Sequence, residues 1–295
     1  MTRDLGITFA GGGNRAFYQL GLMERWAELW PRVAAVSACS AGACVAALIL
    51  SGRAEQAAAY WKARRAHVTR NFDWLALARG QRPAPHGPIY RDTMISVAKD
   101  GGLERIRSQP FPFRVLVAIP PRRLPLAVSV PLALATYNLE KAARPRMLHP
   151  TWGRKIGFEA RLHDARDCRT PEELADLVIA SSSTPPFTPV GRYGGERLLD
   201  GGMIDNAPAF ALDEHDQVDK QLVLLTRPYP AGVAGRSARR LYVAPRQPVP
   251  VERWDYTRPD LVEATVELGR LEADVHRASL DALLAGPVTP SATGG

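Results

Sequence analysis

Residues 33–50 read VAAVSACSAGACVAALIL, and the fold of the chain is best inferred from this segment. A short apolar, β-branched run reaches small residues around Ser40 and then passes into an alanine-rich run. This order predicts a strand, a sharp turn and a helix, with the serine hydroxyl projecting beneath the helix N-terminus. The pattern is G-x-S-x-G with Ala38 in place of the first glycine. For this segment taken alone, a buried strand, loop and helix without chemistry is an equal alternative.

A glycine-rich segment lies near the start of the chain, LGITFAGGGNRA at residues 5–16. Apolar residues predict a strand, and Asn14 is placed to cap a helix that runs to about Trp30. Consecutive glycines allow backbone N–H groups to point into one shared space, where they can bind a phosphate or an oxyanion. A dinucleotide site is disfavoured because the second strand, ending at residues 37–39, carries no carboxylate.

A third segment reads LLDGGMIDNAP at residues 198–208, after the run ASSSTPPF at residues 180–187. Asp200 follows an apolar pair and precedes two glycines, which places a carboxylate at the end of a predicted strand. A plain turn made by the Asp-Gly pair is the common alternative for such a sequence.

Together these segments resemble the patatin-like phospholipase family, whose motifs G-G-G-x-[KR]-G, G-x-S-x-G and D-G-[GA] occur in this order. The resemblance extends over about residues 5–226. Ala16 and Ala38 depart from the family pattern, and each replaces a glycine by the next smallest residue. Neither change removes a catalytic atom.

The resemblance implies an α/β fold, a three-layer sandwich with a mainly parallel central sheet flanked by helices. It implies a lipid acyl hydrolase of the phospholipase A type, working through an acyl-enzyme and needing no metal or cofactor. Ser40 would be the nucleophile and Asp200 the base, a dyad without histidine. The oxyanion and substrate-binding residues would be Gly11, Gly12, Gly13, Arg15 and Ala41. Arg15 would support the oxyanion loop or a lipid phosphate, and a solvated surface arginine is the alternative.

Other bases and nucleophiles are weaker candidates. His215 and His276 are the histidines that would complete a conventional triad in the order serine, acid, histidine. Neither lies in a glycine-framed loop at a predicted strand end. Cys39 neighbours Ser40, but small buried cysteines usually pack as apolar residues.

Two rival functions remain open at the level of sequence. The first is a soluble carboxylesterase or thioesterase, which a comparison of micellar and monomeric substrates would separate. The second is a non-catalytic lipid-binding or regulatory module with the same fold. Labelling by a fluorophosphonate distinguishes this module from an enzyme.

The composition fits one catalytic domain over residues 1–285, followed by a flexible tail at 286–295. The net charge of +8 favours anionic surfaces, and we expect a lipid substrate and transient membrane contact rather than nucleic acid. Three cysteines indicate a reducing compartment. Neither a signal peptide nor a transmembrane helix is expected, so the predicted location is cytoplasmic and peripheral at the membrane.

Residues 120–135 contain arginines and prolines beside an apolar run, which suits a lid or a membrane-facing flap. Prolines at 120, 121, 125 and 131 argue against one continuous helix there. An ordinary strand and a helix packed on the sheet is the alternative. Elsewhere the pattern predicts helices over 41–51, 53–68, 170–181 and 259–284, strands over 113–119 and 221–226, and a proline-rich loop over 80–90.

Overall fold

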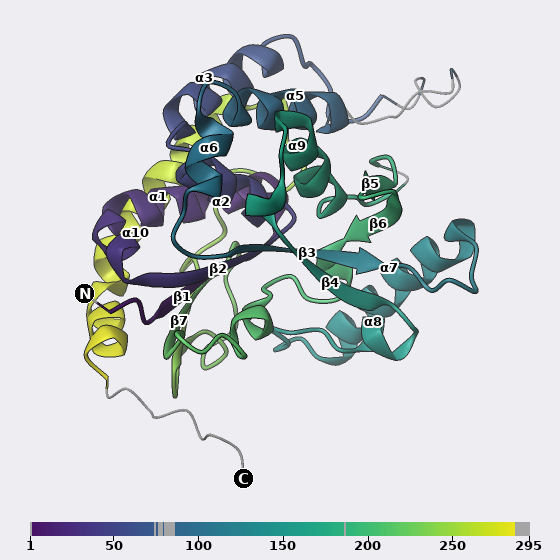
Figure 1. Cartoon of the computed structure of the whole chain (residues 1–295). Helices are drawn as coiled ribbons and strands as arrows, with labels where there is room; N and C mark the ends of the chain where they lie inside the picture. Colours follow the sequence, from purple (N-terminus) through teal and green to yellow (C-terminus); the bar gives the residue numbers. More distant parts are fainter. Residues whose placement is uncertain (1, 74, 76–78, 80–85, 186, 287–295) are drawn as a thin grey trace.

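The computed structural model describes residues 2–73, 75, 79, 86–185 and 187–286. Within these residues a mixed nine-stranded sheet forms the centre of the molecule (Figure 1). β3, β2, β1, β7 and β9 are parallel to one another, whereas β4 and β6 pair antiparallel with β3, β5 with β6, and β8 with β9. The order across the sheet is β5 (Gly191–Tyr193), β6 (Glu196–Asp200), β3 (Phe113–Ile119), β2 (Val33–Cys39), β1 (Leu5–Phe9), β7 (Lys220–Leu224), β9 (Arg240–Val243) and β8 (Gly235–Ser237), with β4 (Glu159–Asp164) on β3.

Helices cover the sheet and complete the predicted three layers. Most of them lie on one face, and α8 lies with short 3₁₀ segments on the other (Figure 1). The α/β prediction of a mainly parallel sheet flanked by helices is therefore confirmed. The helices are α1 (Phe17–Arg25), α2 (Ala41–Leu50), α3 (Ala54–Arg65), α5 (His86–Ala98), α6 (Gly102–Arg107), α7 (Leu126–Ala143), α8 (Trp152–Lys155), α9 (Pro171–Ala180) and α10 (Pro259–Ala285).

The central strands are buried on both faces, as parallel strands in α/β folds are. Leu5, Ile7 and Phe9 of β1 join the large core beneath the helices. On the opposite face, a Cβ added to Gly6 would lie 2.9 Å from side-chain atoms of both Leu212 and Val218. Continuous apolar runs in the sequence reflect this burial on two sides.

Several predicted elements are confirmed within a few residues. The strand and helix around Ser40 are β2 and α2, which begin and end as the small-residue pattern indicates. Thr170 caps α9, and its Oγ1 accepts a hydrogen bond of 3.2 Å from the backbone N–H of Glu173. The closing helix is α10.

The predicted helix from Asn14 to about Trp30 is wrong in its start and its length. A 3₁₀ turn over Gly13–Ala16 precedes α1, which ends at Arg25. The Asn14 side chain is no cap, because its Nδ2 donates to the backbone carbonyl of Asp255 at 2.5 Å. A contact distant in sequence thus replaces the local cap.

The proline-rich loop predicted over residues 80–90 is shorter than expected. α5 begins at His86 and has Pro88 in its first turn, where a missing N–H breaks no helical bond. Residues 80–85 of the predicted loop lie outside the described residues.

The four prolines predict that residues 120–135 do not form one continuous helix, and this holds for residues 120–125 but not for Pro131, because a helix begins at Leu126 and continues through Pro131. Prolines 120, 121 and 125 precede α7, but Pro131 lies inside it. The carbonyl that Pro131 leaves without an N–H belongs to Ala127, and both residues are exposed, so water can replace the lost bond.

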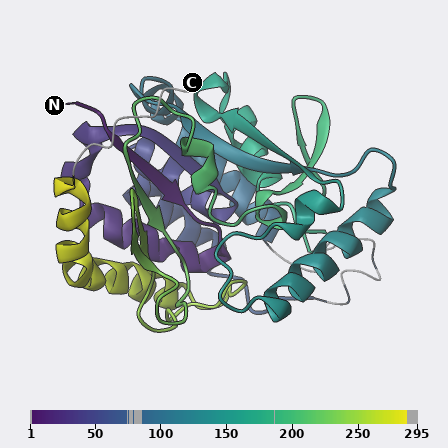
Figure 2. The ribbon, with the colours of Figure 1, turned by 90° about the horizontal axis from the view of Figure 1, so that it is seen from below.

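α7 packs by one side only. Val130 and Ala133 join a small core with Phe158 and residues of β3 and β6. α7 lies at the side of the molecule opposite α10 (Figure 2). Of the predicted tail at 286–295, residues 287–295 lie outside the described residues.

Candidate active site

Ser40 occupies a strained turn between β2 and α2. Its backbone has φ 54° and ψ −130°, outside the regions that non-glycine residues prefer. Two residues on, a Cβ added to Gly42 would lie 2.3 Å from the carbonyl oxygen of Phe9, so only glycine fits. Ala38 pairs with Phe9 in the sheet and is fully buried, and its methyl group is accommodated. The turn therefore has the geometry of a nucleophile elbow.

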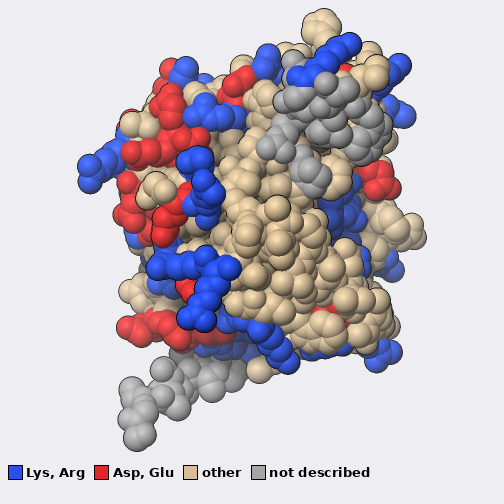
Figure 3. Space-filling view, turned by 90° about the vertical axis from the view of Figure 1, so that its right-hand side faces the viewer, with Lys and Arg blue, Asp and Glu red and all other residues tan. Residues whose placement is uncertain are grey.

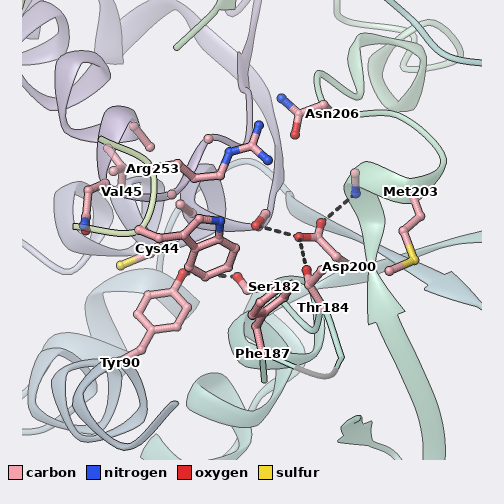
Figure 4. Close-up of a pocket in the computed structure, with 18 of the residues that line it drawn as sticks. Cys44, Val45, Tyr90, Ser182, Thr184, Phe187, Asp200, Met203, Asn206 and Arg253 are labelled. Atoms are coloured by element: carbon pink, nitrogen blue, oxygen red, sulfur yellow. Dashed lines mark hydrogen bonds between the residues drawn. The ribbon is translucent and has the colours of Figure 1, made fainter. Parts of the chain in front are cut away.

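The structure brings Ser40 and Asp200 together although they are far apart in sequence. Ser40 Oγ donates a hydrogen bond of 3.0 Å to Asp200 Oδ2 (Figure 4). Asp200 ends β6, which pairs antiparallel with β3, and β3 in turn pairs with β2. Sheet order thus places the carboxylate beside the elbow.

Two further donors hold the Asp200 carboxylate. The backbone N–H of Gly202 donates to Oδ1 at 2.7 Å, within the turn that follows β6. Thr184 Oγ1 donates to Oδ2 at 3.3 Å. Burial raises the pKa of Asp200 above its ordinary value, and the bonds from Gly202 and Ser40 and the charge of Arg253 act in the opposite direction. The raised pKa makes this carboxylate a better base than an exposed aspartate.

The elbow itself is fixed by a buried serine from the end of α9. Ser181 Oγ accepts a hydrogen bond of 2.8 Å from the backbone N–H of Ser40. The same hydroxyl donates to the carbonyl of Leu116 in β3 at 2.6 Å. Ser181 therefore ties the strained turn to the central sheet.

Gly11 is clamped by its neighbours. Its N–H donates to the carbonyl of Asn206 at 2.8 Å, and its own carbonyl accepts bonds of 2.8 Å from Asn206 Nδ2 and Thr226 Oγ1. Because its N–H is already bonded, Gly11 has no free donor for another acceptor, unlike the oxyanion role predicted for it, and its bonds fix the position of the loop.

Gly12 and Gly13 line the same pocket as Ser40, Ala41 and Asp200. No acceptor among the described residues bonds their N–H groups. A Cβ on Gly12 would lie 2.2 Å from Thr226 Oγ1. Gly13 has φ +60°, and a Cβ there would lie 2.2 Å from the carbonyl of Arg253. The loop thus presents two free donors next to the serine, in a backbone path open only to glycine.

A sequence model of the patatin-like phospholipase family matches residues 7–213, well over half of the chain. The chain belongs to this family. Among solved structures it is similar to VipD from Legionella pneumophila, at 12% sequence identity and a TM-score of 0.45, covering 95% of this chain and 67% of that chain. No curated protein sequence matches it.

The pocket of this patatin-like phospholipase domain has an aromatic wall. Trp61 is its centre, with ring centroids 5.9 Å from Phe17 and 6.0 Å from both Tyr90 and Tyr256. Cys44 and Val45 of α2 extend the same wall (Figure 4). An apolar chain attached to a carbonyl at Ser40 would find its complement here.

The opposite wall is more polar. It comes from α7, from the turn after β6 and from the segment before α10. Its residues are Leu134, Tyr137, Asn138, Gly202, Met203, Asn206, Arg253 and Trp254. The lining residues from these elements thus add an arginine and two asparagines to the aromatic wall.

Arg15 lies behind the glycine loop rather than in the pocket lining. Its side chain is half-buried, and Nε has no hydrogen-bond partner in the described part of the chain. Burial, followed by the charge of Arg253, lowers the pKa of Arg15. The position agrees with support of the loop or with an anion nearby, and it disagrees with a plain solvated arginine.

The weaker candidates lie elsewhere or are inert. Neither His215 nor His276 lines the pocket. His149 Nδ1 lies 2.9 Å from an Asp205 oxygen, and its Nε2 lies 3.1 Å from the hydroxyl of Tyr242. Burial, followed by the charge of Asp200, raises the pKa of the Cys39 thiol, which keeps it protonated and unreactive.

The sequence reasoning missed the pocket residues at 253–256. Arg253, Trp254 and Tyr256 line the pocket from a segment outside the matched residues. Two aromatic residues beside an arginine, in a stretch without periodic pattern, were the available signal. Among described residues no group of three or more His, Cys, Asp and Glu could hold a metal ion. In the same residues, every helix is too short or too polar to cross a bilayer.

Proposed function

We propose that this chain is a phospholipase A-type lipid acyl hydrolase in which Ser40 and Asp200 form the catalytic dyad. The observation that carries the proposal is the 3.0 Å hydrogen bond from Ser40 Oγ to Asp200 Oδ2, beside the unbonded N–H groups of Gly12 and Gly13. Membership of the family supports hydrolysis of lipid esters.

In the first half-reaction, Ser40 Oγ attacks the ester carbonyl and its proton passes to Asp200 Oδ2. The carbonyl oxygen becomes an oxyanion, which the N–H groups of Gly12 and Gly13 stabilise. The ester C–O bond then breaks. Asp200 returns the proton to the leaving alkoxide, and the lysolipid leaves an acyl group on Ser40.

In the second half-reaction, water occupies the position of the lost alcohol. Asp200 accepts a proton from this water as its oxygen attacks the acyl carbon. The second oxyanion uses the same glycine donors. Its collapse breaks the bond to Ser40 Oγ, which takes back the proton, and a fatty acid is released.

An aspartate acts here without histidine because of its surroundings. Burial raises the pKa of Asp200, so its carboxylate holds a proton more readily than an exposed aspartate does. The bond from Gly202 N–H to Oδ1 keeps Oδ2 directed at Ser40. The pocket also joins Gly12 to Arg253, so we propose that residues 1–285 act as one catalytic domain.

We propose that α7 makes transient contact with a lipid surface. Val128, Leu132 and Leu139 are 50%, 36% and 62% exposed and lie at helical spacing on one face. Figure 3 shows a broad uncharged area, bordered by Lys and Arg, on the side of the molecule where α7 lies. Apolar side chains beside cations suit a membrane interface. Changing all three residues to serine should lower activity on vesicles severalfold more than activity on monomeric esters. An equal loss on both would refute this contact.

The dyad is tested by purified protein with mixed phospholipids, read by mass spectrometry, and by a fluorophosphonate label. Ser40→Ala and Asp200→Asn should each lower kcat/KM by about 10³-fold or more. Ser40→Ala should also abolish labelling. The matched controls Ser237→Ala and Asp216→Asn change exposed residues and should leave both readouts unchanged.

The rival functions give different results in this experiment. Hydrolysis of short soluble esters without hydrolysis of phospholipids would indicate a carboxylesterase or thioesterase. Neither turnover nor labelling of the native protein would indicate a non-catalytic lipid-binding module. Full activity of the Asp200→Asn variant would exclude the dyad.

A further inference from the structure

Four cationic side chains from distant parts of the chain gather near the polar wall of the pocket. They are Arg15, Lys141, Arg227 and Arg253, referred to below as the cationic cluster. Besides burial, the charges of Arg253 and Arg227 lower the pKa of Arg15. Besides burial, the charges of all three arginines lower the pKa of Lys141. The geometry agrees: a Cβ added to Gly13 would lie 2.7 Å from Arg253 Cγ, and Arg227 follows Thr226, whose hydroxyl donates to the carbonyl of Gly11, so both arginines lie at the loop that leads into Arg15.

The cationic cluster has no internal counter-charge. Elsewhere in the described residues, arginines such as Arg64, Arg161 and Arg240 form ion pairs with carboxylates. No member of the cluster forms a salt bridge in the described part of the chain. Against the effect of burial, the negative charge of Glu252 raises the pKa of Arg15, but Glu252 is exposed and forms no salt bridge with a cation of the cluster. The positive charge is left for a ligand.

Holding these cations together without a counter-charge is unfavourable. Burial, followed by repulsion from neighbouring arginines, lowers the pKa of both Arg15 and Lys141. Like charges in a partly desolvated site repel more strongly than in water. An anion among them would remove this repulsion and gain charge-assisted hydrogen bonds.

The position of the cluster relates it to the reacting ester. Arg253 lines the pocket together with Ser40 and Asp200, and its side chain lies near the dyad (Figure 4). Lys141 lies one helical turn after Tyr137 and Asn138, which also line the pocket. An ester whose chain lies on the aromatic wall would therefore place its headgroup toward the cluster.

Stabilising the dyad alone does not account for the cluster. The charge of Arg253 lowers the pKa of Asp200, and one arginine is enough for that effect. Arg227 instead lies over the ring of Tyr229, 4.2 Å from its centroid, which fixes its guanidinium. Thr226, next in the chain, is bonded to Gly11, so the position of Arg227 is tied to the oxyanion loop.

We propose that the cationic cluster binds the phosphate-bearing headgroup of the substrate and selects lipids whose headgroup has a net negative charge. The inference rests on the proposed function for its substrate. A phosphate diester carries one negative charge, and an ammonium group in a zwitterionic headgroup would meet four cations without a carboxylate partner. Phosphatidylglycerol should therefore bind more tightly than phosphatidylcholine.

Binding is measured by titration calorimetry with dihexanoyl lipids below their micelle concentration, which removes any effect of a membrane surface. The protein is the full chain with Ser40→Ala, so turnover does not interfere. We expect dihexanoyl phosphatidylglycerol to bind at least about tenfold more tightly than dihexanoyl phosphatidylcholine. Inorganic phosphate should compete only weakly, because it lacks the acyl chains.

Arg253→Gln, Arg227→Gln and Lys141→Gln in the same background should each reduce the preference for phosphatidylglycerol, by about tenfold for Arg253 and less for the others. The matched control is Arg123→Gln. Arg123 is exposed and precedes the start of α7, whereas Lys141 lies near the end of that helix. This control should leave the preference unchanged. Circular dichroism and thermal unfolding verify that each variant is folded.

Each other outcome overturns the inference. If folded Arg253→Gln protein preferred phosphatidylglycerol over phosphatidylcholine as strongly as its parent does, the cationic cluster would have no role in headgroup recognition. Phosphate that competes as well as the lipid would indicate a site for free phosphate. Hydrolysis of phospholipid by the chain with Ser40 intact is measured separately. Absent hydrolysis would refute the proposed function, whereas the binding measurement tests whether the cationic cluster recognises the headgroup.

Discussion

The two sides of the pocket are built in opposite ways. On the dyad side, short side chains at strand ends are held by two or three bonds each, as Asp200 is by Gly202 and Thr184. On the cationic side, long side chains such as those of Arg15 and Lys141 have no partner among the described residues. Rigid placement suits bond making, which needs near-fixed distances. Long cationic side chains without a carboxylate partner suit recognition of a charge that the substrate brings.

Among variants that keep both dyad side chains, the largest expected effect comes from the glycine loop. Gly12→Ala would place a methyl group 2.2 Å from Thr226 Oγ1, which is bonded to Gly11, and the loop must shift. Losing one oxyanion donor costs about 10²-fold in kcat. Esterase kinetics on a soluble substrate measure this loss.

Gly87→Ala is the matched control, since a Cβ there meets only Pro189 at 3.8 Å. Full activity of the Gly12→Ala variant would mean that the dyad side of the pocket does not need a rigidly placed backbone. The contrast between the two sides would then fail.

A smaller effect is expected from the buried serine behind the elbow. Ser181→Ala removes the acceptor of the Ser40 N–H and a donor to the carbonyl of Leu116. Each unsatisfied buried group costs about 1–3 kcal/mol. We expect a drop in Tm of several degrees and about tenfold lower kcat, measured by calorimetry and kinetics. Exposed Ser237→Ala serves as the control, and equal behaviour of the two variants would argue against a fixed elbow.

The smallest effect is a gain in stability. Because burial raises the folded-state pKa of Asp200, the folded protein holds this proton at a pH where the unfolded chain has lost it. Stability from this group therefore falls as the pH rises from the ordinary aspartate pKa through the raised pKa of Asp200. Asp200→Asn removes the buried charge and should raise Tm at neutral pH by about 2 °C.

The same group sets the acid limb of the activity profile. Asp200 must be ionised to accept a proton, so kcat/KM should rise tenfold per pH unit up to its pKa, above the ordinary aspartate range. A lower Tm for Asp200→Asn at neutral pH, or an acid limb at the ordinary aspartate value, would mean that burial of this carboxylate is unimportant.

The sequence was informative where function and local structure require the same small residues. The elbow at Ser40 and the cap at Thr170 follow from short-range rules of sterics and hydrogen bonding. The same rules failed at Asn14, whose side chain bonds Asp255, and at Pro131, where exposure supplies water to a freed carbonyl. Contacts distant in sequence and solvent exposure are not encoded in a local pattern.

The polar wall was the part of the site that sequence could not reveal. Arg253 and Lys141 come from segments without a motif, and only the fold brings Arg253 into the pocket beside Ser40 and Lys141 within range of the charge of Arg253. The role of Gly11 was similarly out of reach. In the sequence, Gly11 is equivalent to Gly12 and Gly13. Only the structure shows that its N–H is already bonded, to the carbonyl of Asn206.

The segment before α10 is held in place by residues other than Ser40 and Asp200. Asp255 accepts bonds from Asn14 and Arg65, and the carbonyl of Arg253 accepts the N–H of Asn14. The stretch over residues 246–258, held to the rest of the fold at these two carbonyls, could be exchanged between relatives while Ser40 and Asp200 stay in place. Retargeting of such an enzyme, in evolution or in the laboratory, would then begin in the loop at 246–258 and leave the nucleophile untouched.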